Sequence, residues 1–112
     1  MKIAIPTENG KLCSHFGHCE RFVIIEVDQK TKTIIRQEDI KAPEHEPGLF
    51  PKWLAEKGVH SVIAGNMGQR AQKLFREQDI HVTVGAPVES AKDLVYSYLE
   101  GTLKTGNNTC DH

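Results

Sequence analysis

The chain has 112 residues, of which 38% are hydrophobic and 26% charged, and its formal net charge is −1. This length fits one domain, and the composition excludes collagen, coiled coils and disordered chains. The even charge balance excludes a basic nucleic-acid-binding face, and no apolar run approaches the roughly 20 residues of a membrane helix. Because the N-terminus lacks a signal peptide's apolar core, we expect a cytoplasmic domain. We expect neither a nucleic-acid nor a membrane partner, and we expect the thiols to be reduced.

The first half of the chain has the apolar pattern of β-strands. Two runs, the first ended by Pro6, predict strands over residues 2–5 and 21–28. A polar break then separates the second run from a third over residues 33–38, which predicts an antiparallel hairpin.

Helices and strands alternate in the second half. A loop over residues 40–51 contains several prolines and leads to a helix that ends at Gly58. The buried face of this helix is predicted to consist of Phe50, Trp53 and Leu54. An almost uninterrupted apolar run over residues 59–65 predicts a central strand that is covered on both faces.

Two further helices are predicted on either side of one more strand. Gly68 opens a helix with Ala71, Leu74 and Phe75 on one stripe, and residues 80–84 alternate as a strand. The last helix has Pro87 in its first turn and ends at Gly101. Its predicted buried face consists of Val88, Ala91, Leu94, Val95, Tyr98 and Leu99. Residues 102–112 lack periodicity and are expected to be mobile.

This order of elements, βββαβαβα, predicts an α/β fold. Short connections and right-handed crossovers give a five-stranded mixed sheet with helices on both faces.

Residues 13–19 carry the densest group of metal ligands in the chain. Their sequence supplies two thiols and two imidazoles, which suit zinc, copper(I) and iron–sulfur species: Cys13, His15, His18 and Cys19. The spacing does not fit a closed structural zinc site. Two alternatives stay open at this point, namely buried cysteines beside solvated histidines and a nucleophilic thiolate beside an imidazole.

Three other segments are candidates for binding. The turn Gly65-Asn66-Met67-Gly68 allows close approach of a ligand to the backbone and leads to a helix N-terminus, although packing alone also favours glycine in such turns. His45 in the proline-rich loop is either a ligand or an ordinary exposed histidine. The pair Cys110 and His112 is either a swinging ligand or part of a terminal segment without a role.

Together these segments resemble the dinitrogenase iron-molybdenum cofactor biosynthesis proteins, a family of small carriers of metal–sulfur cofactors. The resemblance rests on residues 1–6, on Ser14-His15-Phe16-Gly17 followed by Phe22, on the proline-rich stretch with His45, and on residues 61–71. It covers residues 1–103, which leaves residues 104–112 as a flexible tail. It implies a three-layer ribonuclease H-like fold with strand order 3-2-1-4-5 and an antiparallel strand 2.

The resemblance also implies a function. The chain is expected to be a carrier or chaperone, not an enzyme, for a preassembled iron-molybdenum-type or related iron–sulfur cluster that it receives from a donor protein and passes to an acceptor protein. We expect a monomer or a weak homodimer. The alternatives are a Cys-dependent hydrolase or reductase, a simple transition-metal-binding protein and an interaction module.

The site residues follow from the signatures and the ligand chemistry. The expected cofactor-binding residues are Ser14, His15, Phe16, Gly17, His45, Gly65, Asn66, Met67, Gly68 and Arg70. The expected metal ligands are Cys13, His15, His18, Cys19, His45, Cys110 and His112. Two departures from the family pattern are Asn66 in place of a glycine, which is tolerable because asparagine accepts left-handed geometry, and the pair His18-Cys19.

The expected topology brings together the two loops that carry the family signatures. These are residues 13–19, the first signature loop, and residues 65–68, the second signature loop. If strands 1 and 4 are adjacent and parallel, their C-terminal ends form a switch-point crevice beside both loops. The helix that follows Gly68 would then direct its N-terminal turn at a bound anion, and Arg70 would add positive charge unless it faces solvent.

Overall fold

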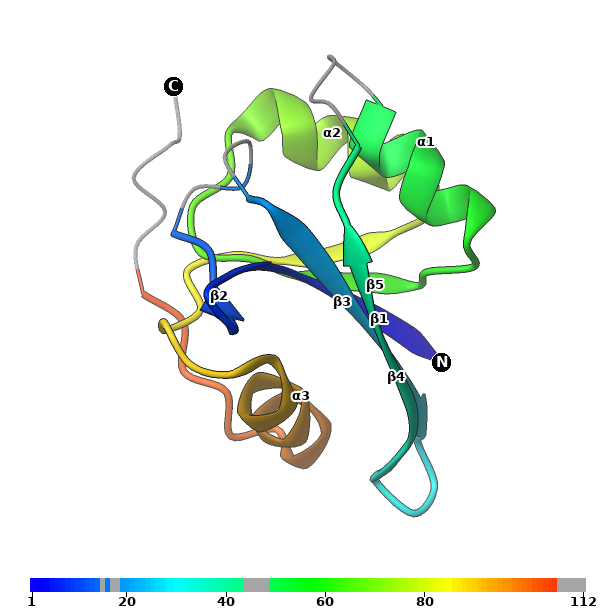
Figure 1. Cartoon of the computed structure of the whole chain (residues 1–112), viewed down its shortest axis with the longest axis vertical. Coiled ribbons are helices and arrows are strands. Elements are labelled where there is room, and N and C mark those ends of the chain that lie inside the picture. The colour runs from blue at the N-terminus through cyan, green and yellow to red at the C-terminus, as the bar shows by residue number, and fades with distance from the viewer. Residues whose placement is uncertain (15, 17–18, 44–48, 107–112) are drawn as a thin grey trace.

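A computed structural model describes residues 1–14, 16, 19–43 and 49–106. The described part contains six strands and three helices (Figure 1). In chain order they are β1 (Lys2–Glu8), β2 (Lys11–Leu12), β3 (Arg21–Asp28), β4 (Thr33–Lys41), α1 (Leu49–Glu56), β5 (Ser61–Ile63), α2 (Gln69–Glu77), β6 (His81–Thr83) and α3 (Ala91–Glu100). None of these helices is long and apolar enough to cross a lipid bilayer.

The strands form one mixed sheet in the order β4-β3-β1-β5-β6, with β2 paired to β1 outside this path. β3 is antiparallel to both β1 and β4, whereas β1, β5 and β6 are mutually parallel. The predicted order and the antiparallel second strand are therefore confirmed. The predicted strand count of five is wrong by the short strand β2.

The unpredicted strand β2 results from a tight hairpin after β1. Asn9 and Gly10 both have positive φ, at 54° and 81°, and Thr7 and Glu8 pair with Leu12 and Lys11. An Asn-Gly pair at these angles is the preferred two-residue hairpin turn, because its twist matches that of the strands. The Asn-Gly pair between Glu8 and Lys11 is the sequence signal for this hairpin.

Contrary to the prediction, Pro6 does not end β1. Proline has no backbone N–H, but at this position an N–H would point away from β3, so the ladder between β1 and β3 loses no hydrogen bond. The Pro6 carbonyl accepts a hydrogen bond from Cys13 N (2.9 Å), so the backbone polar groups of Pro6 point toward the returning chain and away from β3. On that side, β1 pairs with β5 only at Ile3 and Ala4. The strand therefore continues through Pro6 to Glu8.

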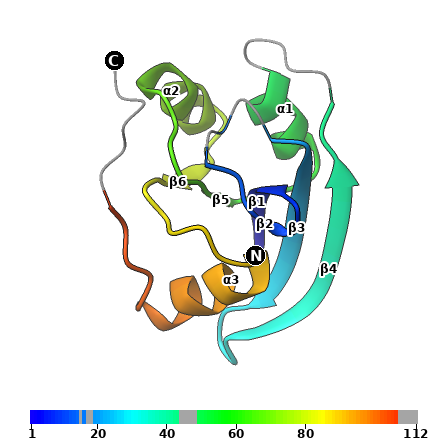
Figure 2. The same ribbon diagram turned by 60° about the vertical axis from the view of Figure 1, so that its left-hand side comes forward.

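The helices cover both faces of the sheet, as predicted, and Figure 2 shows the sheet between them. The face under α1 and α2 carries a core of twelve buried residues that includes four phenylalanines: Phe16, Phe22, Phe50 and Phe75. The opposite face packs against α3 through buried aliphatic residues, among them Ile3, Ile5, Ile25, Leu94 and Val95. Each face thus buries the apolar side chains that alternate along β1 and β3.

α3 begins later than predicted. Its N-cap is Ser90, whose hydroxyl accepts a hydrogen bond from Asp93 N (3.2 Å). The preceding segment is held as extended chain, because Leu12 N donates to Glu89 O (2.9 Å). Pro87 therefore precedes the helix, and Val88 is 57% exposed instead of buried. The predicted end at Gly101 is confirmed, with a left-handed φ of 74°.

The remaining boundaries differ by a few residues. β5 and β6 are shorter than the predicted runs, because only three residues of each pair in register. Beyond α3, Thr102 N and Leu103 N donate to Ser97 O, and Gly106 N donates to Gly85 O (2.7 Å). Residues 107–112 lie outside the described part, so the flexible tail over residues 104–112 stays a prediction.

Candidate functional site

The two signature loops begin at the same edge of the sheet. β1 and β5 are adjacent and parallel, so their C-terminal ends lie side by side. The first loop does not leave β1 directly but follows β2, and the bond from Cys13 N to Pro6 O brings it back beside β1. The second loop leaves β5 and leads to α2.

Backbone hydrogen bonds join the two loops. Asn66 N donates to Ser14 O (2.9 Å), and Phe16 N donates to Asn66 O (3.1 Å). Asn66 thus pairs with the first loop through both of its backbone polar groups, as a residue does in a β-ladder. The expected meeting of the loops is confirmed at these residues, whereas Gly17 lies outside the described part.

Gly65 is required by the contact between the loops. A Cβ atom at this position would lie 3.1 Å from Ser14 O and 3.4 Å from Cys13 O, so a side chain would force the Ser14 carbonyl to move by a few tenths of an ångström. Neither Gly65 nor Asn66 has a positive φ. Asn66 therefore does not adopt the left-handed geometry that asparagine tolerates. The atoms nearest to a Cβ at Gly65 belong to the backbone of the first loop.

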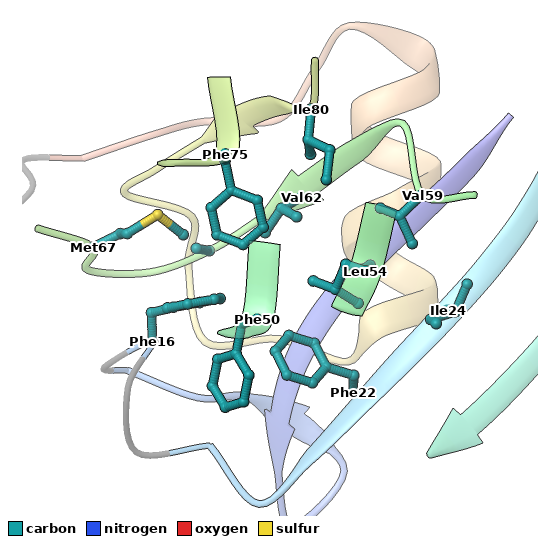
Figure 3. Close-up of a cluster of buried hydrophobic side chains, with 12 residues drawn as sticks. Phe16, Phe22, Ile24, Phe50, Leu54, Val59, Val62, Met67, Phe75 and Ile80 are labelled. Atoms are coloured by element: carbon teal, nitrogen blue, oxygen red, sulfur yellow. The ribbon is translucent and has the colours of Figure 1, made fainter. Parts of the chain in front are cut away.

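Two signature side chains point into the core. Figure 3 shows Phe16 and Met67 directed toward the cluster beneath α1 and α2, and they are 6% and 1% exposed. The ring of Phe16 makes edge-on contacts with Phe22, Phe50 and Phe75 at centroid distances of 6.0, 5.5 and 5.4 Å. Such contacts stabilise beyond the burial of area alone. Phe16 and Met67 thus anchor both loops from below.

The two described cysteines of the first loop are not joined in a disulfide, and they lie in an apolar setting. Cys13 is 3% exposed, and Cys19 packs partly buried against the phenylalanine cluster. Burial, with a smaller contribution from charge repulsion by the neighbouring Cys13, raises the pKa of the Cys19 thiol from its ordinary value of 9.0 to about 12. Near neutral pH Cys19 is therefore protonated, which is unfavourable for a nucleophile.

The N-terminus of α2 carries positive charge at the end of the second loop. Gly68 is the N-cap and supplies no side-chain oxygen, and the first turn contains no acidic residue. Instead it contains Arg70, whose side chain is exposed. A cation in the first turn opposes the helix dipole, so this arrangement disfavours the free helix and favours a bound anion.

Gln72 is a positioning residue that the sequence analysis missed. Its side-chain amide donates to Met67 O (2.9 Å), which ties the second loop to the first turns of α2. No sequence signal identifies it, because a glutamine in a helix has no characteristic partner.

The predicted metal ligands are only partly described. Cys13 and Cys19 lie in the first loop, whereas His15, His18, His45, Cys110 and His112 lie outside the described residues, as does Gly17. Within the described ranges, no three His, Cys, Asp or Glu side chains are arranged to hold a metal ion. The full ligand set therefore stays a prediction.

The contact between the loops predicts the effect of a methyl group at Gly65. Gly65→Ala is expected to lower the free energy of unfolding by about 1–3 kcal/mol, because the new Cβ must displace the Ser14 carbonyl. Denaturant unfolding measures this change. Ser14→Ala serves as the control, since it keeps the backbone carbonyl and is expected to cost less than about 0.5 kcal/mol. Equal stability of Gly65→Ala and the parent chain would contradict the close approach.

The raised pKa of Cys19 predicts slow reaction with iodoacetamide near neutral pH. Relative to a thiol of pKa 9.0, the thiolate fraction is lower by about a thousandfold, and the rate of alkylation at Cys19, followed by peptide mass spectrometry, falls with it. The unfolded chain releases this proton near pH 9.0 and the folded chain only near 12. The free energy of unfolding therefore falls between these pH values, and Cys19→Ala removes that part of the fall. Rapid alkylation of Cys19 in the folded chain would contradict the assignment.

Comparisons with known proteins agree with this geometry. Residues 1–101 match the family model described as dinitrogenase iron-molybdenum cofactor. The uncharacterized protein MJ0580 of Methanocaldococcus jannaschii is 33% identical over 107 residues, which cover 93% of this chain and 90% of that protein.

Solved structures share the fold. The crystal structure of PH0822 has a TM-score of 0.86 at 26% identity and covers 94% of each chain. The apo form of the orange protein from Desulfovibrio gigas has a TM-score of 0.74 at 21% identity, over 96% of this chain and 93% of that one. The family match spans both signature loops and nearly the whole described fold. The chain therefore belongs to the dinitrogenase iron-molybdenum cofactor family.

Proposed function

We propose that this chain is a carrier that binds a preassembled metal–sulfur cluster where its two signature loops meet, and passes it from a donor protein to an acceptor protein. The observation that carries this proposal is the pairing of Asn66 with Ser14 and Phe16, beside the uncapped N-terminus of α2. The family to which the chain belongs takes its name from the iron-molybdenum cofactor, and this supports a cluster as the cargo.

Charge favours an anionic cargo at this place. Metal–sulfur clusters of the iron-molybdenum type are anions, and the first turn of α2 offers free N–H groups that together act as about half a positive charge. Arg70 adds a full charge in the same turn, and no acidic residue in that turn offsets it. The cluster would therefore be attracted by the second loop even before any side chain ligates it.

Direct ligands would come from the first loop. Cys13, His15, His18 and Cys19 supply the soft donors, and His45 is the candidate from the proline-rich loop. Imidazole binds as a neutral ligand or, when protonated, donates a hydrogen bond to sulfide. Because distributed charge and few fixed thiolates bind less permanently than a closed cage of cysteines, this arrangement favours release to an acceptor.

Two alternatives fare less well. A Cys-dependent hydrolase or reductase needs an accessible thiolate in the free chain, whereas Cys13 is buried and the pKa of Cys19 is raised. A metal, by contrast, displaces the thiol proton as it binds. A simple metal-binding protein needs no positive charge at α2, whereas the exposed Arg70 in its first turn suits an anion.

A binding titration with tetrathiomolybdate, a molybdenum–sulfur dianion, tests the proposal. Equilibrium dialysis is expected to show binding by the parent chain. Arg70→Ala is expected to weaken the binding by about three- to tenfold, and added salt is expected to weaken it as well. Arg76→Ala is the matched control, because it removes the same charge from the last turn of α2. Its affinity is expected to stay within about twofold of the parent.

Three outcomes would contradict the proposal or its electrostatic part. If the parent chain binds neither tetrathiomolybdate nor an iron–sulfur cluster but does bind Zn²⁺, it is a simple metal-binding protein. If it binds none of these, the carrier role is wrong. If Arg70→Ala and salt leave the affinity for tetrathiomolybdate unchanged, ligation alone holds the cargo.

A further inference from the structure

β4 forms a long open edge of the sheet. It spans nine residues and lies at the outer end of the strand order, as Figure 2 shows. The strand at the other edge, β6, has only three residues. Edge strands expose backbone donors and acceptors that pair readily with another strand, and short ones are protected by their length. In the described fold, β4 is therefore the edge most able to accept a partner strand.

The backbone groups that face outward from β4 can be identified. Ala42 N donates to Glu20 O (3.0 Å), one step beyond the pair of Arg21 with Lys41. Because hydrogen-bonded and non-hydrogen-bonded pairs alternate along an antiparallel ladder, Lys41, Asp39 and Gln37 direct their backbone N–H and C=O groups to the open edge.

The sequence of β4 is complementary to itself when the whole strand pairs, whereas an axis at Ile40, which also opposes Asp39 and Lys41, overlaps only residues 39–41 of β4. We propose that two copies of this chain dimerise by antiparallel pairing of β4 with β4 about a two-fold axis at Gln37. In this register Gln37 faces Gln37 of the second copy through outward-directed backbone groups, and Arg36 faces Glu38 of the second copy twice. Axes at Arg36, Glu38 or Asp39 would place identical charges opposite each other, which is destabilising.

Arg36 and Glu38 are available for this pairing. Both side chains are exposed, and in the described part of the chain the ion pair that forms joins Arg21 to Asp39 instead. They share the sheet face of α1 and α2, where they line a hollow of about 100 Å³ with Lys2, Ile24 and Glu26. In the proposed dimer they form non-hydrogen-bonded pairs, in which side chains of neighbouring strands approach most closely.

The interface is short and the dimer correspondingly weak. The ladder between β3 and β4 shifts register between Glu26 and Val27. Glu26 pairs with Arg36 and Val27 pairs with Ile34, so Ile35 has no partner in the ladder. This bulge at Ile35 limits the regular part of the edge. The two-fold axis reverses the strand direction. The junction of the two signature loops in one copy therefore lies at the opposite end of the joined sheet from the junction in the other copy. Each copy would then present its junction without obstruction by the other.

Sedimentation equilibrium of the full chain at concentrations up to about 1 mM tests the proposal. The parent chain is expected to dimerise. Arg36→Glu and Glu38→Arg are each expected to lower the association constant by about tenfold or more, because each creates two like-charge pairs. The double variant Arg36→Glu/Glu38→Arg restores both opposite-charge pairs and is expected to return to within about threefold of the parent. Lys92→Glu on α3 is the matched control and is expected to leave association unchanged.

A backbone variant tests the hydrogen bonds of the interface. Gln37→Pro removes the outward N–H without removing a bond to β3, and it is expected to abolish dimerisation. Circular dichroism verifies that each variant is folded. A parent chain that stays monomeric at every concentration overturns the proposal. A dimer that Arg36→Glu leaves intact, or that the double variant fails to restore, overturns the register.

Discussion

The loops that follow β2 and β5 are joined by the hydrogen bonds from Asn66 N to Ser14 O and from Phe16 N to Asn66 O. This pairing extends the contact between β1 and β5 beyond their regular ladder, which includes only two residues of each strand. Because the bonds are between backbone groups, they fix the paths of the two loops at Ser14, Phe16 and Asn66. The position of the described part of the first loop relative to the second loop, which leads to α2, depends on this short ladder.

The neighbouring residues make this pairing possible. Gly65 leaves room for the Ser14 carbonyl, and Phe16 and Met67 fasten the loops to the phenylalanine cluster. Gln72 ties Met67 to α2, so the helix that supplies positive charge is attached to the same junction. Several signature residues therefore build the junction of the two loops, and under the proposed function Arg70 and the first-loop donors would contact the cargo. This division explains how a site made largely of loops is held in place without a closed metal cage.

The fold was predictable from sequence where the spacing of apolar residues determines the type of an element. It was less predictable where single backbone hydrogen bonds determine the boundary of an element or the path of a loop. Apolar runs and the crossover rule predicted a mixed sheet with helices on both faces, because β1, β3 and β5 bury apolar side chains, whereas the strand order was implied by the resemblance to the family. Pro6 and Pro87 misled the assignment of boundaries, since a bond from Cys13 and the cap at Ser90 set the local path. The meeting of the loops followed from parallel adjacent strands. That Phe16 points inward did not, because loops lack the period that tells inside from outside.

The most direct test of the account is a ¹H–¹⁵N correlation spectrum of the chain during titration with tetrathiomolybdate. If both loops and the first turn of α2 form one site, the amide signals of Phe16, Asn66 and Arg70 shift together with one dissociation constant. The amides of Gln37 on β4 and Lys92 on α3 stay unchanged. Shifts confined to Arg70, with Phe16 and Asn66 unaffected, would contradict the account, because the anion would then occupy a helix end and not a site built by the two loops.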